Sequence, residues 1–416
     1  MSLSLNTRSV YDAFFDPVRG LAARTRQHRP CPEFSDEDWL LFNLHRVLEA
    51  SPSGRGFLQE HGPRFATQPS RSNYFTSIAS ERRRGVARDV NALLIAAGDP
   101  GDRLAAIPEL ARYRCFATDG HWHAAATHDR RAASGAKAPV GHFYSLDLHS
   151  HFLRHLAAAE SAHEHDMSVL KRLKPAGLRQ GVPKGSRVLL VHDRAGIDFG
   201  FWKRCRQECA VYFLSRVKEG MVFEHLLDQE FDPADPRNRG VLGDRRVHTR
   251  DGLLLRIVVY REPGTGKEYQ FLTNETDLPP GVVAELYRRR WEIEKVFDEL
   301  KNKLAERKAW ATSLVAKEVQ GQLVAIAHNL MVLYQRHLQT GLGVSDQAEN
   351  LRRERRAELL TREAEAQGRS VSSLVLGLRS ATQRSVKFIR WLRHALRENL
   401  AEAAAVPRLA HLMSSS

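Results

Sequence analysis

The sequence YRRRWEIE occupies residues 287–294 and is followed by a lysine at position 301. In an α-helix, which turns by about 100° per residue, four polar residues of this stretch lie within about 60° of one another. They are Tyr287, Arg290, Glu294 and Lys301. An adjoining face is apolar, as expected for a helix that packs on a core; it carries Leu286, Ile293, Val296, Phe297, Leu300 and Leu304. We therefore predict a helix from Gly281 to about Leu304.

Two further carboxylates follow segments that are typical of strands. Residues 113–118 form a short predicted strand that ends at Asp119, and residues 187–192 form a buried one that runs into Asp193. Two carboxylates at strand ends and a third on a helix, Glu294, can converge at the edge of a mixed sheet. We predict that these three side chains meet.

The elements around these carboxylates indicate a mixed α/β core. Strands are expected at residues 121–127, 142–148 and 210–215, and helices at residues 153–173 and 197–205. The segment from about 216 to 270 differs, because it has short β-like runs separated by Gly and Pro turns. Those runs lie at residues 253–260 and 269–272. We predict a β-rich insertion whose last strand rejoins the main sheet.

The two ends of the chain have a helical texture. We divide the chain into a helical N-terminal DNA-binding region at residues 1–108, a catalytic domain at 109–335 and a helical C-terminal region at 336–416. A further helix is predicted over residues 313–337, and residues 345–416 are rich in arginine. No internal repeat interrupts this order.

The composition favours a polyanionic partner. The 416 residues include 63 Lys and Arg against 49 Asp and Glu, for a formal charge of +14. Nucleic acid is the first candidate for such a chain and a membrane surface is the weaker alternative. Neither a membrane-spanning apolar run nor a signal-peptide core is present, so we expect a cytosolic protein. Four cysteines are too few for a disulfide framework, and their spacing does not predict a zinc site.

The three acidic residues suit hard divalent cations. Carboxylate oxygens are preferred ligands of Mg²⁺ and Mn²⁺. Two such ions, roughly 3.5–4 Å apart, stabilise the entering and leaving oxygens of an in-line phosphoryl displacement. One ion activates water or a DNA 3′-hydroxyl, and the other supports the leaving 3′-oxygen. This chemistry needs no covalent enzyme intermediate.

These motifs resemble those of a large group of bacterial insertion-sequence DDE transposases. The four polar residues of the predicted helix match that group's Tyr-x2-Arg-x3-Glu-x6-Lys signature at every spacing. Asp119 with Gly120 resembles the first catalytic aspartate of the group, and Asp193 resembles the second. The pair Thr273-Asn274 ahead of the helix is also of the family type. The resemblance covers about residues 70 to 335.

The resemblance implies both a fold and an activity. The expected fold is a ribonuclease H-like mixed-sheet catalytic core with a β-rich insertion. The expected activity is cut-and-paste DNA transposition, in which terminal inverted repeats are bound, cleaved and joined through their 3′-ends to target DNA. Asp119, Asp193 and Glu294 would be the catalytic metal ligands. A homodimer bridging two transposon ends is implied, as is second-strand cleavage through a DNA hairpin in many members. The expected location is a bacterial cytoplasm, on the nucleoid when bound to DNA.

Several basic and aromatic residues are candidate DNA contacts. Tyr287, Arg290 and Lys301 are expected to bind phosphates near the cleaved bond, where contacts position a strand without reading its sequence. The alternative is structural pairing with Glu294 or its neighbours. Trp291 could stack on an unpaired base, although such a Trp is more often part of a core. An arginine group near the N-terminus is also assigned to DNA, against a solvated charged face: Arg71, Arg82, Arg83 and Arg84.

Other readings of these residues remain open. Asp147 is the main alternative to Asp119, because it also lies in a predicted strand that precedes a helix. Two histidine groups, at residues 121–128 and 149–165, fit no standard metal spacing. The alternative functions are a related DNA nuclease without strand transfer and a non-enzymatic DNA-binding protein derived from a transposase. Retention of all three carboxylates argues against the non-enzymatic class.

Overall fold

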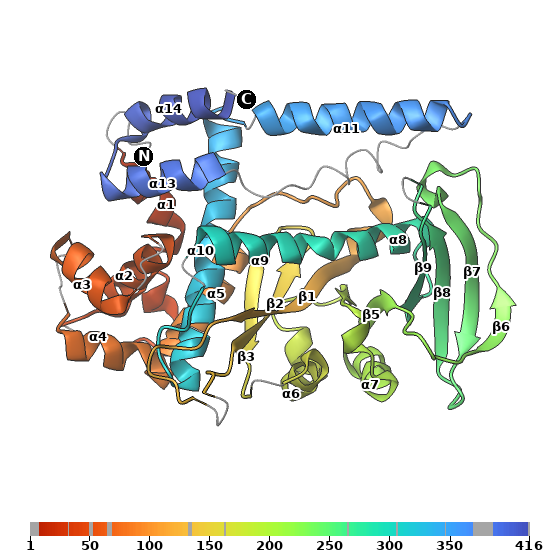
Figure 1. Cartoon of the computed structure of the whole chain (residues 1–416), viewed down its shortest axis with the longest axis horizontal. Helices are drawn as coiled ribbons and strands as arrows, with labels where there is room; N and C mark the ends of the chain where they lie inside the picture. Colours follow the sequence, from red (N-terminus) through yellow and green to blue (C-terminus); the bar gives the residue numbers. More distant parts are fainter. Residues whose placement is uncertain are drawn as a thin grey trace.

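The computed structural model (Figure 1) places one large mixed sheet between two layers of helices. The structure describes ten ranges: 8–31, 33–49, 53–64, 69–131, 135–161, 164–263, 266–304, 307–345, 347–368 and 386–414. The sheet has nine strands in the order β3-β2-β1-β4-β5-β9-β8-β7-β6. They are β1 (Tyr113–His123), β2 (Val140–Asp147), β3 (Leu153–Ala158), β4 (Arg187–Val191), β5 (Val211–Arg216), β6 (Glu224–Asp228), β7 (Val241–His248), β8 (Leu254–Arg261) and β9 (Glu268–Thr273).

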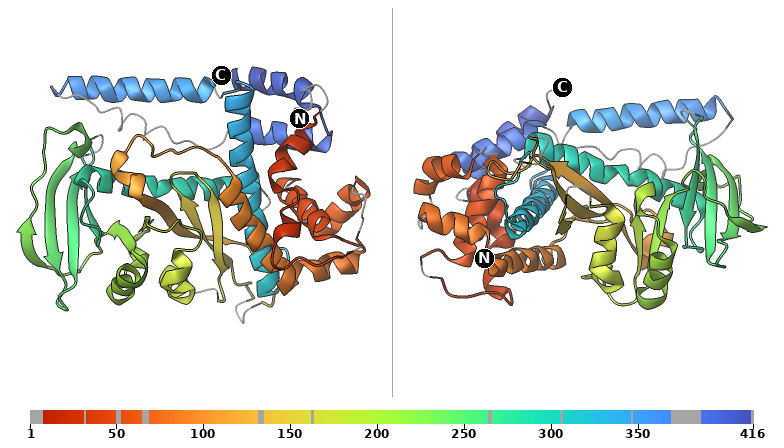
Figure 2. Two further views of the ribbon diagram at one scale, coloured as in Figure 1. Left: turned by 180° about the vertical axis from the view of Figure 1, so that it is seen from behind. Right: turned by 60° about the horizontal axis from the view of Figure 1, so that its bottom comes forward.

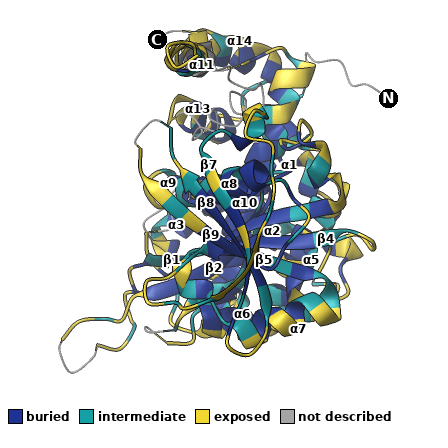
Figure 3. Ribbon diagram, turned by 90° about the vertical axis from the view of Figure 1, so that its right-hand side faces the viewer, coloured by how far each residue is buried: buried dark blue, intermediate teal, exposed yellow. Residues whose placement is uncertain are grey.

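The parallel strands β1, β4 and β5 form the centre of the sheet, and the flanking pairs are antiparallel. The run VLLV at 188–191 is fully buried because both faces of β4 are covered. On one face, Val188 and Leu190 pack with α6 (Asp166–Leu178) and α7 (Phe199–Cys209). On the other, Leu189 and Val191 belong to the main core with α9 (Trp291–Lys303) and α10 (Leu314–Gly341). Figure 3 shows this buried centre in dark blue, with α9 and α10 above the strands and α6 and α7 below them.

The prediction of two strands separated at Asp119 and Gly120 is wrong. β1 runs unbroken through both residues, which stay in the antiparallel ladder with β2 opposite Tyr144 and Phe143. Asp119 is therefore inside a strand and not at its end. It still lies beyond the parallel ladder with β4, which stops at Ala117. The carboxylate thus projects from an edge of the parallel centre, although the strand itself continues.

The prediction of a helix over residues 153–173 is also wrong. Residues 153–158 form β3, which pairs with β2 in an antiparallel ladder. The helix α6 begins only at Asp166. Leu, Ala and His give this segment a helical composition, but Leu153, His155 and Ala157 alternate as buried positions along β3. Pairing with β2 overrides the intrinsic helix propensity.

The β-rich insertion forms the outer half of the sheet, as Figures 1 and 2 show. The prediction that its last strand rejoins the main sheet is confirmed, because β9 pairs antiparallel with β5. Two residues fasten this joint: the Thr273 hydroxyl donates to the Phe213 carbonyl, and the Asn274 side-chain oxygen accepts from the Phe213 N–H at 2.9 Å. The exposed strand β6 and the mostly polar β7 were not predicted.

The two ends of the chain are helical, as predicted. The N-terminal helices are α1 (Val10–Phe15), α2 (Asp36–Glu49), α3 (Gly54–His61), α4 (Arg71–Ile78) and α5 (Glu81–Ala97). The C-terminal ones are α11 (Gln347–Glu365), α13 (Val386–Arg397) and α14 (Glu402–Ser414). Short 3₁₀ turns lie at Asp16–Val18, Ala22–Arg24, Gly62–Arg64, Pro108–Arg112, Arg194–Gly196 and Pro236–Asn238. Serine side chains cap the N-termini of several of the α-helices: Ser9, Ser53, Ser70, Ser80 and Ser313.

The long helix α10 joins the ends of the chain to the sheet. It is buried along most of its length and contacts β3, α2 and α5. The two ends of the chain also meet directly, because the Val10 N–H donates to the Leu400 carbonyl at 2.8 Å and the Glu402 N–H to the Arg8 carbonyl at 2.9 Å. One apolar cluster therefore includes side chains from all three predicted regions.

A buried ion pair in the insertion provides a test of its stability. Arg256 on β8 donates to both oxygens of Asp244 at 2.8 and 2.6 Å and to the Leu278 carbonyl, and both charged side chains are 2% exposed. Arg256→Ala would leave the Asp244 carboxylate buried without its cation. We expect it to lower the free energy of unfolding by about 3–5 kcal/mol, measured by chemical denaturation.

The matched control is Arg261→Ala on the same strand. Arg261 pairs with Glu268, but both side chains are about half exposed. Its loss should cost less than about 1 kcal/mol. Equal losses for the two variants would show that burial of the Arg256 pair is not what stabilises the insertion.

Candidate active site

The helix that carries the sequence signature consists of two segments that meet at Arg290. α8 (Pro280–Arg289) and α9 share this residue as their boundary. Its φ of −51° and ψ of −34° are helical, so the axis continues in nearly the same direction (Figure 1). The Arg290 N–H bonds to the Tyr287 carbonyl at 3.1 Å, three residues back, which tightens this turn. The predicted single helix is therefore correct in course and extent, with a tight turn at Arg290.

Arg290 connects two of the three predicted carboxylates. Its Nη1 lies 3.2 Å from Asp119 Oδ2, and its Nη2 lies 2.6 Å from Glu294 Oε1. The arginine side chain is 6% exposed, against 21% for Asp119 and 35% for Glu294. A strand residue and a helix residue that are far apart in the sequence thus share one guanidinium.

Asp193 lies at the same edge of the sheet. It follows β4, and its side chain accepts a hydrogen bond from the Ala195 N–H at 2.7 Å, so it also caps the short turn that follows. The Ser215 hydroxyl donates to the Asp193 carbonyl at 2.8 Å, which fixes the backbone here. The negative charge of Asp193 is close enough to Asp119 to raise the pKa of that carboxyl.

Asp119 is the most strongly perturbed member of the group. Burial raises its pKa to about 7, Arg290 opposes this, and the charges of Asp166 and Asp193 add to the increase. Burial and then Asp193 likewise raise the pKa of Asp166. Burial is the main cause of both increases, and the neighbouring carboxylates add to it.

Asp166 was missed by the sequence analysis. Asp166 is the first residue of α6, which covers the face of the sheet opposite to α9. Together with Asp119 and His192 it lines a small cavity. A Cβ on Gly120 would come within 3.2 Å of an Asp166 carboxylate oxygen, so glycine allows this approach. The incorrect prediction of a helix over residues 153–173 explains this omission. It placed Asp166 in the middle of a helix, whereas Asp166 is the first residue of α6.

The remaining signature residues differ in exposure. Tyr287 is 4% exposed and packs on Phe271 with ring centroids 4.8 Å apart, so it supports α8 from within the core. Lys301 is exposed at the far end of α9. Trp291 is 54% exposed, with the Arg290 guanidinium 5.1 Å from its ring, so the alternative that Trp291 is a core residue is wrong.

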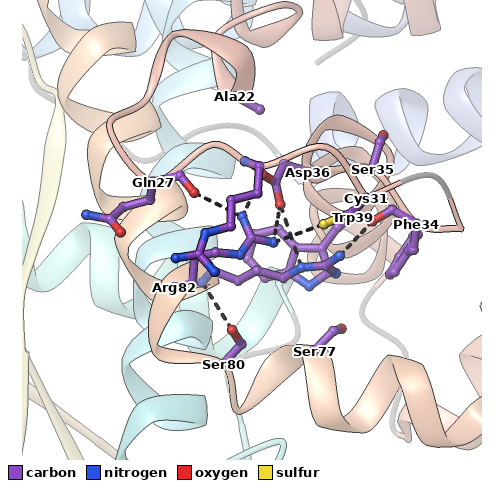
Figure 4. A network of polar contacts seen from close by, with 12 residues as sticks. Ala22, Gln27, Cys31, Phe34, Ser35, Asp36, Trp39, Ser77, Ser80 and Arg82 are labelled. Atoms are coloured by element: carbon purple, nitrogen blue, oxygen red, sulfur yellow. Dashed lines mark hydrogen bonds and ion pairs between the residues drawn. The ribbon is translucent and has the colours of Figure 1, made fainter.

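Three of the four N-terminal arginines make contacts inside the protein. Arg82 binds both oxygens of Asp36 at 2.7 Å, which Figure 4 shows in the network around the start of α2. Arg83 is buried and donates to the Phe34 carbonyl, and Arg84 pairs with Glu318 on α10. These guanidinium groups join α5 to its neighbours, which is the role of structural arginines. Arg71 is exposed.

The alternative residues lie in other surroundings. Asp147 is opposite Phe116, toward the other end of β1 from Asp119, and accepts from the backbone N–H groups of His149 and Ser150. Four buried histidines, not predicted as a group, form a row of ring contacts: His121, His123, His142 and His155. Burial lowers the pKa of His123, His142 and His155, so these rings are kept neutral. His163 lies outside the described residues.

Comparison with known proteins agrees with this arrangement. Residues 118–330 match the family described as the transposase DDE domain, a span that starts one residue before Asp119 and ends within α10. No curated protein is significantly similar in sequence. Among the described residues, no helix combines the length and apolar character needed to cross a membrane. The family match covers slightly more than half of the chain and contains Asp119, Asp193 and Glu294. The chain therefore belongs to the DDE transposase family.

Proposed function

We propose that this transposase moves a bacterial insertion sequence by a cut-and-paste route. It would bind terminal inverted repeats, cleave them by Mg²⁺-assisted hydrolysis and join the 3′-ends to target DNA. The observation that carries the proposal is the contact of Asp119 and Glu294 with one guanidinium beside Asp193. We infer a ribonuclease H-like arrangement, in which β1, the segment after β4 and α9 supply these three carboxylates.

The residues at this edge fit divalent cations. All three are hard oxygen donors, and Mg²⁺ and Mn²⁺ prefer such ligands. The charges of Asp166 and Asp193 add to the effect of burial on the pKa of Asp119, so both lie near enough to act on it. Two bound ions would supply Lewis-acid stabilisation of the attacking and leaving oxygens. We infer that Asp119, Asp193 and Glu294 would hold them.

Arg290 has a second role in this proposal. In the structure it donates to Asp119 and Glu294, which keeps two like charges at a fixed separation. Once cations neutralise those carboxylates, the guanidinium is able to bind a phosphate oxygen of the scissile strand instead. Tyr287 would act indirectly, since it supports the turn at Arg290 from the core.

DNA would lie along the exposed side of α9. Trp291 presents an exposed ring one residue from Arg290, where it could stack on a base that has left the duplex. Lys301, ten residues after Trp291 on the same helix, would contact a phosphate. We further propose that residues 1–108 bind the transposon ends, with Arg71 among the contacts, and that a homodimer bridges both ends.

The first prediction of this proposal concerns the carboxylates. Glu294→Gln and Asp193→Asn should abolish cleavage of a labelled transposon-end duplex while specific binding, measured by gel shift, stays within about twofold. An amide keeps the size of the side chain but loses the charge that holds a cation. The control is Asp298→Asn, one turn along α9, where the carboxylate accepts from Asn302 at 2.6 Å. Cleavage at the wild-type rate by Glu294→Gln would remove that residue from the site.

Strand transfer separates the proposal from a simple nuclease. Precleaved ends incubated with plasmid and Mg²⁺ should give joined products. Hydrolysis without joined products would identify a nuclease of the same fold. Specific DNA binding with neither product would identify a non-enzymatic protein derived from a transposase.

A second prediction concerns the exposed face of α9. Lys301→Ala should weaken DNA binding and reduce the slope of log K against log salt by about one unit, because one phosphate contact is lost. The control is Lys184→Ala, an exposed lysine in the turn before β4. An unchanged salt slope for Lys301→Ala would show that this side chain touches no phosphate.

A third prediction follows from the pKa of Asp119, which rises from an ordinary 3.8 to about 7. Above pH 7 the carboxyl is ionised in both folded and unfolded chains, so its burial costs up to about 4 kcal/mol, at about 1.4 kcal/mol per pKa unit. Asp119→Asn should therefore raise the melting temperature at pH 8 by a few degrees.

This gain has a defined pH window. As the pH falls from 7 toward 4, the folded protein takes up the proton first and the cost disappears, so the gain of the variant should shrink. Calorimetric scans without divalent metal at pH 8, 6 and 4.5 would measure it. A lower melting temperature for Asp119→Asn at pH 8 would mean that the Arg290 contact outweighs the burial of charge.

A further inference from the structure

A second group of metal-binding side chains lies in the N-terminal helices, outside the match to the family. His45 and Glu49 are four residues apart on α2 and so share one face of that helix. His61 is the last residue of α3 and faces them. One ligand atom from each of the three residues lies within 4.8 Å of the other two.

This group is buried among aromatic rings. His45 and His61 are 3% and 1% exposed, and the Glu49 side chain is 2% exposed. The ring of Phe57 stacks on His61 at 4.9 Å and lies 6.0 Å from His45. An apolar wall of this kind excludes water and strengthens any electrostatic interaction within it.

The two oxygens of Glu49 have different surroundings. Oε2 receives Arg397 of α13 at 2.6 Å. Oε1 lies 3.6 Å from His45 Nε2 and accepts no hydrogen bond from the described part of the chain. A buried carboxylate oxygen without a donor is costly. Here it faces two imidazoles, and a cation held between the three groups would satisfy it.

We propose that His45, Glu49 and His61 bind a Zn²⁺ ion. Two imidazole nitrogens and one carboxylate oxygen form a donor set that zinc accepts, whereas Mg²⁺ prefers oxygen ligands alone. Zinc–ligand bonds of about 2.0–2.2 Å require the three atoms to draw closer by small side-chain movements. A fourth ligand would come from outside this group, either water or the exposed Glu60, whose Oε1 lies 3.6 Å from His61 Nε2 and which would have to turn toward the ion.

The position of the site indicates a structural role. The ion would tie the end of α2 to the end of α3, and the Arg397 contact on the same carboxylate would extend the tie to α13. The N-terminal helices and the C-terminal helices would then move as one unit. This site uses none of the residues proposed for catalysis.

The test uses the full chain with Asp193→Asn and Glu294→Gln in every sample, so that the proposed catalytic site does not contribute zinc ligands. Zinc affinity is measured by competition with a chromophoric chelator, and Co²⁺ replaces zinc for visible absorption. The parent should bind one zinc with a four-coordinate Co²⁺ spectrum. His61→Gln and His45→Gln should each weaken binding by more than about tenfold.

The matched control is His149→Gln. His149 is also a buried histidine paired with a carboxylate, Asp102, at 3.1 Å. It should bind zinc like the parent, and a chelator should lower the melting temperature of the parent and of this control but not that of His61→Gln. If the parent binds no zinc, or if His45→Gln and His61→Gln bind it as tightly as the parent, the group is a hydrogen-bonded histidine–carboxylate cluster only and the proposal is overturned. Circular dichroism identifies a variant that has failed to fold, and the other histidine variant then decides.

Discussion

The guanidinium of Arg290 lies between the carboxylates of Asp119 and Glu294, and the geometry of the candidate site depends on this contact. Burying one charge is costly, and removing its partner is more costly still. Arg290 offsets part of the effect of burial on Asp119, whereas the charges of Asp166 and Asp193 add to it, so the pKa of Asp119 stays near 7. The contacts of Arg290 therefore hold the carboxylates of Asp119 and Glu294 close together at the edge of the sheet.

The sheet explains why these groups can meet. Asp119 lies two residues beyond the last parallel pair of β1 with β4, and Asp193 lies two residues beyond Val191 in the same ladder. Two strands that run in parallel and stop their pairing together must present their next side chains side by side. β9 then returns from the insertion to pair with β5 and leads directly into α8, which brings Glu294 across the same edge. Because the insertion ends in a strand paired with β5, the helix that follows it can still bring Glu294 close to Asp119.

The sequence allowed these chemical groups to be predicted better than the elements that carry them. The local pattern of apolar residues was sufficient to predict β4, which is a continuous apolar run, and the signature helix, which has one apolar face. It failed for residues 153–158, where composition favours a helix and only the ladder with β2 makes a strand. It also failed at Asp119 and Gly120, which read as a turn unless their antiparallel partners are known. Asp166 was missed for the same reason, since its position depends on where β3 ends.

Net charge alone does not indicate which basic residues are available to bind DNA. The 63 Lys and Arg residues include arginines that are paired inside the protein, such as Arg82 with Asp36 and Arg256 with Asp244. A buried, paired guanidinium adds to the number of basic residues but offers no donor to a phosphate. The useful quantity is the exposed charge on elements that carry the carboxylates, and Lys301 is exposed on α9, the helix of Glu294. A run of arginines in a basic chain therefore predicts a nucleic-acid surface only after its internal partners have been identified.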